Sequence, residues 1–599
     1  MLGTARLEQL IEESIPALEV AGLALAIAGP GSRSLSTGAG FADVRTRAKA
    51  SRSTLFRIGS TSKLVTATAA MQLVERGELD LDADINQYLE PRLQIPPGYG
   101  RPVTLRNLLT HTAGFEENQL GYMVKRSAAD LLPLADNLAI NKPAQVRAPT
   151  VDFCDGRGAS YSNWGIALAG HIVARRARMP FDDCVERHLF EPLGMDRSSF
   201  REPLPREMAR QLAAGYHRGS DGALIEHGFE YFHSIGPAGS MSTTADDMLR
   251  FMRAHLGTGV STLQASTMRL MHSRVLDPHP MVNGAGLGFY EINLRGRRAV
   301  GHQGATICFV SQLVLVPEEQ VGIFVVVNTR IPARRLQAFV ATLMDALLPQ
   351  RRSISVALRS TSANRYVGTY LATPHSHRRQ EKCLLLAMPD YEMKVSATPR
   401  GTLQISNLAG RREWSEIDRG VFRQDGSHEM VAFVEDADGK VSHMLGPAAF
   451  APAYKVEASQ APTFHRELLA HAATGFHLVL AWHATSRAAS RASPCARPVM
   501  EIAAMVAALN LTGWSLLRES FATGGIALVY AYPESFRNGL ALIVLASQLT
   551  RIILQLTLHA WVHEQWTQAE RQDLALFSAL LLAFFGSLRA WNLVGPTAL

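Results

Sequence analysis

Four residues, Ser60-Thr61-Ser62-Lys63, combine a hydroxyl and an amine at a spacing that suits nucleophilic catalysis. A serine hydroxyl titrates too high to attack a carbonyl unaided, so it needs a base that is largely unprotonated near neutral pH. Side chains at positions i and i+3 meet on one helix face, so Lys63 can be the base for Ser60. A serine before a helix is more often an N-cap than a nucleophile. Lysine is scarce in this chain, however, and this is its only S-x-x-K.

The flanking residues predict a strand, a turn and a helix. Leu55 to Gly59 has the pattern of a short strand that ends in a glycine turn, and apolar residues then recur at helical spacing as far as Gly77. Ser60 is therefore expected near a helix N-terminus, where backbone N–H groups and the positive end of the helix dipole gather. This field favours an oxyanion and disfavours an ammonium, so we expect it to lower the pKa of Lys63.

A second motif, Tyr161-Ser162-Asn163, precedes an apolar helix expected over about residues 166–173. A phenol near a cation can lose or share its proton, so Tyr161 can relay a proton between the nucleophile and the leaving group. The Asn163 amide can hold Lys63 or a substrate carbonyl. The alternative is a half-buried tyrosine before a helix with an asparagine cap.

A third motif, His302-Gln303-Gly304-Ala305, precedes a β-hairpin expected over residues 309–327. Gly304 would let the strand backbone approach a ligand closely. The Ala305 N–H can pair with the Ser60 N–H to form an oxyanion hole. His302 would lie beside the substrate, and the alternative for it is a structural histidine.

In this order, S-x-x-K, Y-x-N and H-x-G resemble the serine β-lactamase and penicillin-binding-protein superfamily, and specifically its class C branch. Three further segments are similar to that branch: Leu108 to Phe115 (LLTHTAGF), Glu191 to Met195 (EPLGM) and Pro237 to Met248 (PAGSMSTTADDM). The resemblance covers roughly residues 5 to 345. It implies an α+β fold in which helices flank an antiparallel sheet, as the mixed strand and helix patterns also suggest.

The resemblance also implies roles for the motif residues. Ser60 would be the acylated nucleophile and Lys63 its general base, while Tyr161 shares or takes over proton transfer. Asn163 would position the substrate. The chain has no G-x-S-x-G elbow, which argues against an α/β-hydrolase.

His302 and Gly304 stand where the family has its K-T-G strand motif. The lysine of that motif helps to bind the carboxylate of β-lactams and peptidoglycan stems, and a mostly uncharged histidine is a weaker anchor. Relatives with H-x-G look more often like esterases, D-aminopeptidases or amide hydrolases. We therefore expect a peptide or amide substrate first, such as a D-aminoacyl peptide or an acyl-peptide prodrug. An ester or lactone comes second, and weak β-lactamase or DD-carboxypeptidase activity third.

A function of another class stays open, because an acylation site can also serve a ligand sensor. A sensor would be acylated once and stay trapped, whereas an enzyme would deacylate and turn over.

The length of 599 residues leaves room for several domains. We expect the catalytic domain over residues 1–348 and a polar, basic linker over 349–364. Short strands and the hairpin signals Asp425-Gly426 and Asp438-Gly439 mark a β domain over 365–460. This domain resembles the small lipocalin-like barrel that often follows such hydrolases. We interpret it as a packing or spacer module, and the alternative is a lid or exosite over the catalytic cleft.

Residues 465–599 carry few charges and several long apolar stretches. These stretches are 473–484, 499–517, 539–562 and 574–594. Spans of about twenty apolar residues are typical of transmembrane helices, so we predict a bundle of three or four, the first being the uncertain one. Arg551 falls within the predicted span 539–562. This position indicates either that the bounds of the span are misplaced or that the arginine faces the interior of the bundle. The closing Trp591-Asn592-Leu593-Val594-Gly595 is similar to the end of membrane-anchored members of the family.

Two features of the sequence give conflicting predictions for the side of the membrane on which the catalytic domain lies. The N-terminus shows no apolar signal region. Residues 487–497, however, carry three arginines and no acid, which places that loop in the cytoplasm and the catalytic domain outside. Either the start lies upstream or the catalytic domain faces the cytoplasm, and we favour the first. The expected location is a bacterial cell membrane, with several spans and an extracytoplasmic catalytic domain.

The net charge of +7 and the pI of about 9.2 are mild for this length. The arginines are scattered, so we expect no nucleic-acid partner; the expected partners are a small-molecule or peptide substrate and the lipid bilayer. The five cysteines show no disulfide or metal spacing, and Cys308 is expected in the core. They are Cys154, Cys184, Cys308, Cys383 and Cys495. We predict no cofactor and no metal.

Overall fold

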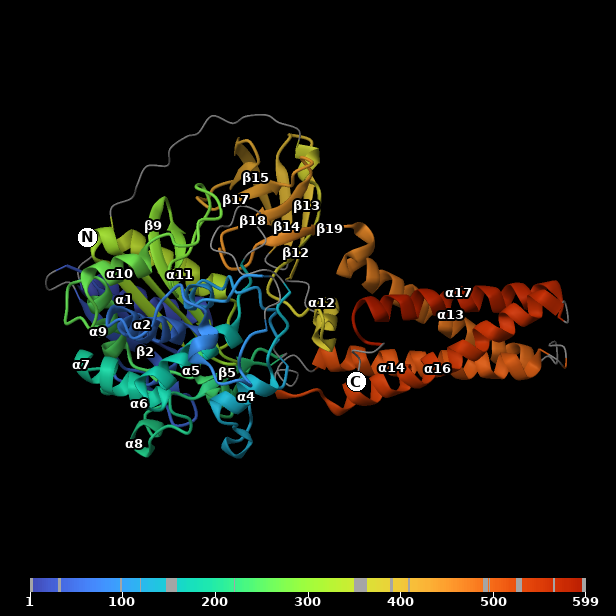
Figure 1. Cartoon of the computed structure of the whole chain (residues 1–599), viewed down its shortest axis with the longest axis horizontal. Helices are drawn as coiled ribbons and strands as arrows, with labels where there is room; N and C mark the ends of the chain where they lie inside the picture. The colour runs from blue at the N-terminus through green and yellow to red at the C-terminus, as the bar shows by residue number, and fades with distance from the viewer. Residues whose placement is uncertain are drawn as a thin grey trace.

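The computed structural model divides the chain into a catalytic α+β domain, a β-barrel and a bundle of long helices (Figure 1). The described residues are 4–30, 34–96, 100–118, 120–146, 159–219, 221–348, 363–387, 391–407, 410–488, 494, 496–523, 530–563 and 566–594. The predicted linker 349–364 lies outside them up to residue 362, as do Cys154, Cys495 and most of the arginine-rich loop. The three predicted parts and the α+β class are confirmed.

The catalytic domain is built on a seven-stranded antiparallel sheet in the order β3-β2-β1-β11-β10-β9-β8. Its strands are β1 (Gly22–Ala28), β2 (Leu35–Asp43), β3 (Ala48–Lys49), β8 (Tyr290–Leu294), β9 (Arg297–Ala305), β10 (Val310–Val316) and β11 (Val321–Val327). The strands β10 and β11 form the predicted hairpin. Because β1 pairs with β11, the first and last strands of the domain's sequence lie at the centre of the sheet.

Helices cover both faces of this sheet, which explains why every residue of β1 is buried. Leu23, Leu25 and Ile27 face a core shared with α1 (Thr4–Leu18) and α11 (Ala333–Leu347). The alternate residues of β1 face the larger core, which holds the helices that carry the motifs. The helices of that side include α2 (Ser62–Glu75), α3 (Leu105–Leu109), α4 (Leu134–Ile140), α5 (Asn163–Ala177), α6 (Phe181–Val185), α7 (Glu191–Leu193), α9 (Ala245–His255) and α10 (Ala265–His272).

The β domain is a closed eight-stranded barrel. Its strands are β12 (Gly368–Ala372), β13 (Glu392–Ala397), β14 (Leu403–Asn407), β15 (Gly410–Asp418), β16 (Val421–Gln424), β17 (Met430–Glu435), β18 (Val441–Leu445) and β19 (Ala453–Val456). Both predicted hairpin signals lie at turns between barrel strands, where Gly426 and Gly439 adopt positive φ angles of 70° and 75°. Closure pairs β12 with β19, so the barrel has no free sheet edge.

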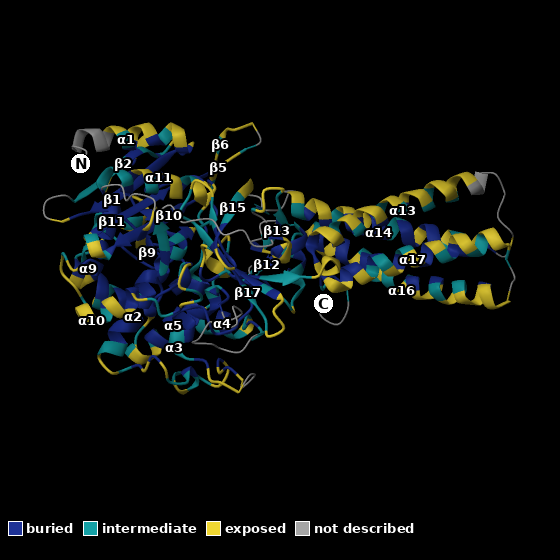
Figure 2. Ribbon diagram, turned by 90° about the horizontal axis from the view of Figure 1, so that it is seen from above, coloured by how far each residue is buried: buried dark blue, intermediate teal, exposed yellow. Residues whose placement is uncertain are grey.

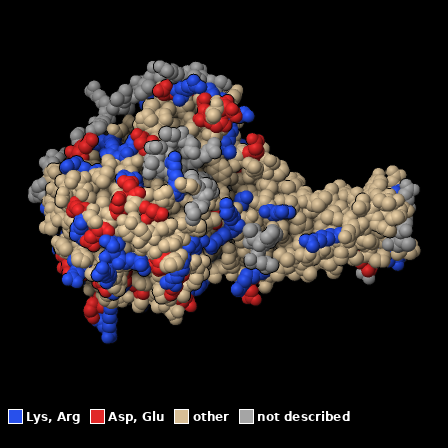
Figure 3. All heavy atoms as spheres, viewed as in Figure 1, with Lys and Arg blue, Asp and Glu red and all other residues tan. Residues whose placement is uncertain are grey.

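Four long helices form the bundle, which projects away from the other two parts (Figure 1). They are α13 (Pro462–Ala488), α14 (Arg497–Thr523), α16 (Glu534–His563) and α17 (Gln568–Ala590). Three of them are long and apolar enough to cross a membrane: 497–522, 534–563 and 568–590. The visible surface of the bundle carries fewer charged side chains than that of the catalytic domain (Figure 3).

Arg551 corrects one expectation about the bundle. It lies within the continuous helix α16, so the bounds of the span are not misplaced there, and its side chain is exposed rather than turned inward. The inward stripe of α16 includes Ile543, Ala546, Thr550 and Ile553, and residue 551 falls beside this stripe. The outward faces of the helices are exposed over much of their length (Figure 2).

A short connection over residues 373–387 ties the three parts together. In the catalytic domain, Glu116 accepts hydrogen bonds from the backbone N–H groups of His377 (2.8 Å) and Arg378 (3.0 Å). On the bundle side, the Asn592 amide donates to the His377 carbonyl at 3.1 Å, and Lys382 donates to the carbonyl that ends α17. The connection ends in α12 (Leu384–Ala387), which packs in the core of the bundle.

Candidate active site

The nucleophile candidate lies where the sequence predicted a turn into a helix. The strand β4 (Phe56–Arg57) pairs with β7 (Ser242–Thr243), and the single 3-10 turn Gly59–Thr61 then leads Ser60 into α2. Lys63 lies one turn further on, with its side chain fully buried. Its Nζ contacts the Ser60 Oγ at 2.8 Å and also donates to the Ala238 carbonyl at 2.6 Å.

The surroundings of Lys63 favour a neutral amine. Burial lowers the pKa of Lys63 to about 7, and the charge of Glu117 opposes part of this shift. The direction agrees with the sequence expectation, but the cause is burial, whereas the sequence suggested the helix terminus. At neutral pH the Lys63 amine is therefore unprotonated in a large fraction of the molecules, and it can accept a proton.

Tyr161 lies against both members of this pair. Its hydroxyl hydrogen bonds with Ser60, and the Lys63 Nζ lies 5.0 Å from the centre of its ring. His111 stacks on the other side, with the ring centres 4.4 Å apart, and its Nδ1 accepts the Ser162 N–H at 3.0 Å. Burial raises the pKa of Tyr161, so it is a protonated phenol near neutral pH. It can relay a proton but is a poor primary base.

Glu117 also belongs to this cluster, and the sequence motifs do not predict it. Asn163 donates to the Glu117 carboxylate through its backbone N–H (3.0 Å) and its Nδ2 (2.6 Å), while its Oδ1 accepts from Lys63 (2.7 Å). Burial raises the pKa of Glu117 to about 8, and the two bonds from Asn163 oppose the rise. The available signal was the acid pair Glu116-Glu117 directly after the segment 108–115.

His302 lies on β9 with only 2% of its surface exposed. Burial lowers the pKa of His302 to about 3, and the charge of Lys63 adds to this effect. Its Nδ1 hydrogen bonds with the Gln303 carbonyl, and its Nε2 has no hydrogen-bond partner among the described residues. The imidazole is therefore neutral and holds no charge for a substrate carboxylate.

Gly304 differs in detail from its expected role. A Cβ at this position would lie 1.9 Å from the Ile58 carbonyl oxygen and 2.9 Å from the Thr61 nitrogen. The close approach is thus to the turn that carries the nucleophile, whereas a ligand was expected there. Glycine is required because any side chain would separate β9 from that turn.

Ala305 ends β9 beside the same turn, and a Cβ at Gly59 would lie 2.8 Å from the Ala305 nitrogen. Thr306 donates its N–H to the Phe309 carbonyl at 2.9 Å. Because alternate residues of an antiparallel pair bond across it, the Ala305 N–H points away from β10. The structure therefore brings this amide and the start of α2 together.

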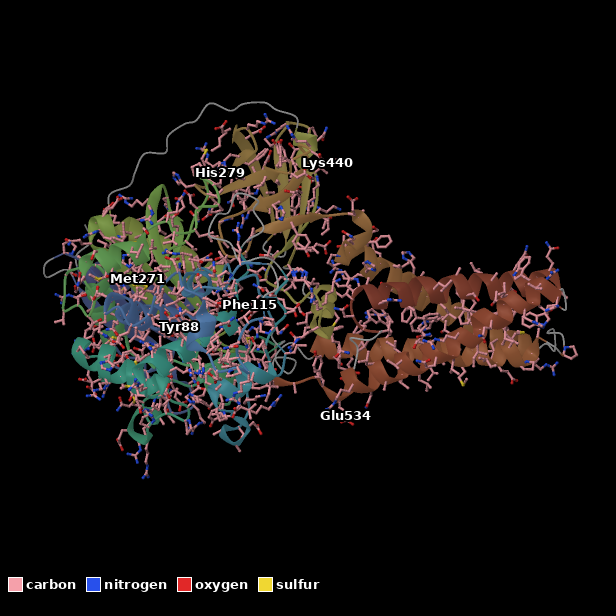
Figure 4. The ribbon with its side chains drawn as sticks, in the orientation of Figure 1. Tyr88, Phe115, Met271, His279, Lys440 and Glu534 are labelled. Atoms are coloured by element: carbon pink, nitrogen blue, oxygen red, sulfur yellow. The ribbon has the colours of Figure 1, made fainter. Side chains whose placement is uncertain are left out.

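The cluster opens into a cleft of about 1100 Å³ whose walls come from both the catalytic domain and the barrel. The catalytic domain supplies Ser60, Glu117, Tyr161, Asn163, Tyr290, His302 and Ala305, and the barrel supplies Gln424, Ser427, His428, Glu429 and Phe450. Figure 4 labels His279 on the side of the catalytic domain that faces the barrel.

Phe450 of the barrel contacts three residues of the site, His111, Tyr290 and Tyr161. Its ring centre lies 4.6 Å from that of His111 and 5.8 Å from that of Tyr290, and its carbonyl accepts the Tyr161 N–H at 3.1 Å. The barrel therefore packs against the candidate site, and its role as a packing module or as a lid or exosite stays a prediction. The turn between β18 and β19 lines the cleft.

The antiparallel sheet and the helices that cover it define a β-lactamase-like fold, and the serine–lysine contact lies at the start of α2 in this fold. The sequence matches the Beta-lactamase family over residues 7–343, more than half of its length. The chain belongs to this family, whose members are serine hydrolases.

Three relatives show the range of names within the family. Penicillin-binding protein 4 of Amycolatopsis lactamdurans is 32% identical over 283 residues, which are 44% of this chain and 69% of that protein. The D-alanyl-D-alanine-carboxypeptidase/endopeptidase AmpH of Escherichia coli K12 is 27% identical over 293 residues, 47% and 72% of the two chains. Esterase EstB of Burkholderia gladioli is 30% identical over 226 residues, 36% and 55%.

Among solved structures, SurE is similar in fold. Its TM-score is 0.53 at 23% identity, and the match covers 76% of this chain and 98% of the other.

Proposed function

We propose that this protein is a membrane-anchored serine hydrolase that works through a covalent acyl-enzyme on a peptide or amide substrate. The observation that carries the proposal is the 2.8 Å contact between the Lys63 Nζ and the Ser60 Oγ, in a buried pocket that favours the neutral amine. A base of this kind, with a pKa near the operating pH, suits general-base activation of a hydroxyl.

The first half-reaction uses groups that lie in contact. Neutral Lys63 accepts the Ser60 hydroxyl proton as the Oγ attacks the substrate carbonyl. The amides of Ser60 and Ala305 stabilise the oxyanion. The proton then passes from Lys63, through the Tyr161 hydroxyl, to the leaving amine, and the C–N bond breaks to leave an ester on Ser60. Water adds to this ester in the reverse sequence, which releases the acid and restores the serine.

The choice of substrate rests on His302 and on the relatives. Neutral His302 offers no cation to a substrate carboxylate, which argues against the recognition expected for β-lactams. Two relatives bear the names of a D-alanyl-D-alanine-carboxypeptidase and an esterase. We favour D-aminoacyl peptides, amides or acyl-peptide prodrugs as substrates, and esters or lactones second.

We also propose that the bundle anchors the enzyme in a lipid bilayer, with the catalytic domain on the extracytoplasmic side. The arginines between 487 and 497 supply the positive charge that favours the cytoplasm. The helix α13 starts beside the barrel, and the chain is back at the catalytic domain by Tyr530, which joins its core. Three helices, α14, α16 and α17, are long and apolar enough to cross. If α14 crosses, this return is explained by a crossing of α13 as well, so we propose four spans. Protease digestion of intact spheroplasts tests the orientation: cleavage of the catalytic domain supports it, and protection contradicts it.

A fluorophosphonate probe tests the mechanism on the full chain in detergent. We expect intact-mass spectrometry to show one adduct on the wild type and none on Ser60→Ala. Ser62→Ala is the matched control, because this neighbouring serine donates to the Gly59 carbonyl and should leave labelling intact. Full hydrolytic turnover by Ser60→Ala would overturn the mechanism. Turnover of D-aminoacyl amides, as opposed to a single trapped acylation, separates an enzyme from a sensor.

A further inference from the structure

Two histidines and a cysteine converge at a second place in the catalytic domain, outside the cleft. His217 lies on β5 (Gly215–Arg218) and His227 ends β6 (Leu224–His227), while Cys308 lies in the turn between β9 and β10. One nitrogen of each imidazole and the Cys308 sulfur all lie within 4.8 Å of one another. Imidazole and thiolate are the ligands that Zn²⁺ prefers in proteins.

The local fold explains why the histidines meet. In the β5–β6 hairpin, His227 lies opposite Gly215, so His217 is its diagonal neighbour on the same face. Gly215 also admits the cysteine, since a Cβ there would lie 2.8 Å from the Cβ of Cys308. The turn is fixed from behind, because Glu230 accepts the Cys308 N–H at 3.0 Å.

The hydrogen bonds of the two histidines are those expected of metal ligands, because each ring keeps a nitrogen that can bind a metal. The Nδ1 of His217 is buried and has no hydrogen-bond partner among the described residues. The Nε2 of His227 is 2.8 Å from the Tyr530 hydroxyl, which leaves its Nδ1 for a metal. A metal-bound imidazole usually hydrogen bonds through its second nitrogen, which fixes the orientation of the ring. Cys308 is a free thiol with 1% of its surface exposed.

We propose that His217, His227 and Cys308 form a Zn²⁺ site, in which Tyr530 positions His227. Binding exchanges the thiol proton of Cys308 for the metal and releases that proton to solvent. Water completes the coordination at the fourth position. The site fastens the β5–β6 hairpin to the turn that follows Ala305.

Tyr530 connects the proposed metal site to the helical bundle. It lies between α14 and α16, packs in the core of the catalytic domain and stacks under Arg126, whose guanidinium carbon is 4.5 Å from its ring centre. Figure 1 shows the chain before α16 reaching towards the catalytic domain. Glu534 marks the start of that helix (Figure 4). The site therefore lies where the bundle meets the catalytic domain.

Metal titration of the full chain in detergent, after treatment with a chelator, tests the proposal. We expect one equivalent of Co²⁺ to give thiolate-to-metal charge-transfer absorption, and Zn²⁺ to abolish it by displacement. Cys308→Ser should lose this absorption. Cys184→Ser, the matched control at a buried cysteine on α6, should keep it. Absence of the absorption in the wild type, or its persistence in Cys308→Ser, would overturn the proposal.

Two further variants keep the test decisive if Cys308→Ser does not fold. His217→Asn retains the cysteine and should lower the affinity for Zn²⁺ at least a hundredfold, with an unchanged circular dichroism spectrum. Tyr530→Phe should lower that affinity by about 10–100-fold, as expected for an outer partner of a ligand. Equal affinity in the wild type and His217→Asn would mean adventitious binding and would refute the site.

Discussion

Two buried basic side chains, those of Arg57 and Lys63, flank the nucleophile three residues away on either side, and their environments differ. Lys63 contacts neutral oxygens, those of Ser60, Asn163 and Ala238, and among the described residues no carboxylate contacts it directly. Arg57 makes an ion pair with Glu202, with both side chains 1% exposed. The Arg57 guanidinium also lies 4.5 Å from the centre of the Phe229 ring.

The comparison shows how one short segment can hold a base and a structural charge. Burial without a contacting anion disfavours the charged form of Lys63 and leaves an amine that can take a proton. The Glu202 carboxylate and the aromatic face stabilise the charge of Arg57. The first environment suits catalysis, and the second holds the turn in place.

The sharpest test of this comparison is Lys63→Arg. The variant keeps a cation of similar reach but cannot act as a base, so the rate of fluorophosphonate labelling should fall by about 10²–10⁴-fold. Labelling is followed by intact mass over time. Lys63→Met should lose a similar factor. Activity in the arginine variant close to that of the wild type would show that Lys63 acts only through its charge.

The reciprocal test is Arg57→Met, which leaves Glu202 buried without its cation. Burial already raises the pKa of Glu202 to about 7, and Arg57 opposes that rise. We expect a loss of about 3–5 kcal/mol in the stability of the catalytic domain, as for other broken buried pairs. Thermal unfolding in detergent measures it.

Lys63→Met serves as the control in the same assay, because it removes a buried amine that contacts no anion among the described residues. It should lose much less stability than Arg57→Met. Equal losses for the two variants would contradict the contrast between the two environments.

The sequence predicted much of the catalytic centre because its signals are local. The i, i+3 spacing puts Lys63 beside Ser60, and the hairpin after His302 follows from two β-rich runs around the turn at residues 317–320. Burial of Lys63 is a tertiary property, so the sequence predicts the direction of the shift in its pKa but not the cause. The bond between Glu117 and Asn163 spans 46 residues, and no local pattern reports it. The docking of Phe450 depends on how two domains pack, which a strand pattern does not reveal.

The pH dependence of labelling sharpens the comparison further. The base is the neutral form of Lys63, whose pKa of about 7 lies below its unperturbed value of 10.5. The labelling rate should therefore rise about tenfold per pH unit below pH 7 and level off above it. Stopped-time labelling between pH 5 and 9 measures the profile. A midpoint near 10 would mean that the lysine is solvated in solution.

The smallest expected effect concerns Phe450, whose ring touches the Tyr161 side of the site and not the Lys63–Ser60 contact. An aromatic pair contributes about 0.5–1.5 kcal/mol of interaction free energy beyond that of the buried surface area. Phe450→Ala should therefore slow labelling by about two- to tenfold. The pH midpoint should not move, because the surroundings of Lys63 stay intact. Lys440→Ala, an exposed position at the far side of the barrel (Figure 4), is the control and should match the wild type. If Phe450→Ala also matches it, the barrel wall takes no part in catalysis.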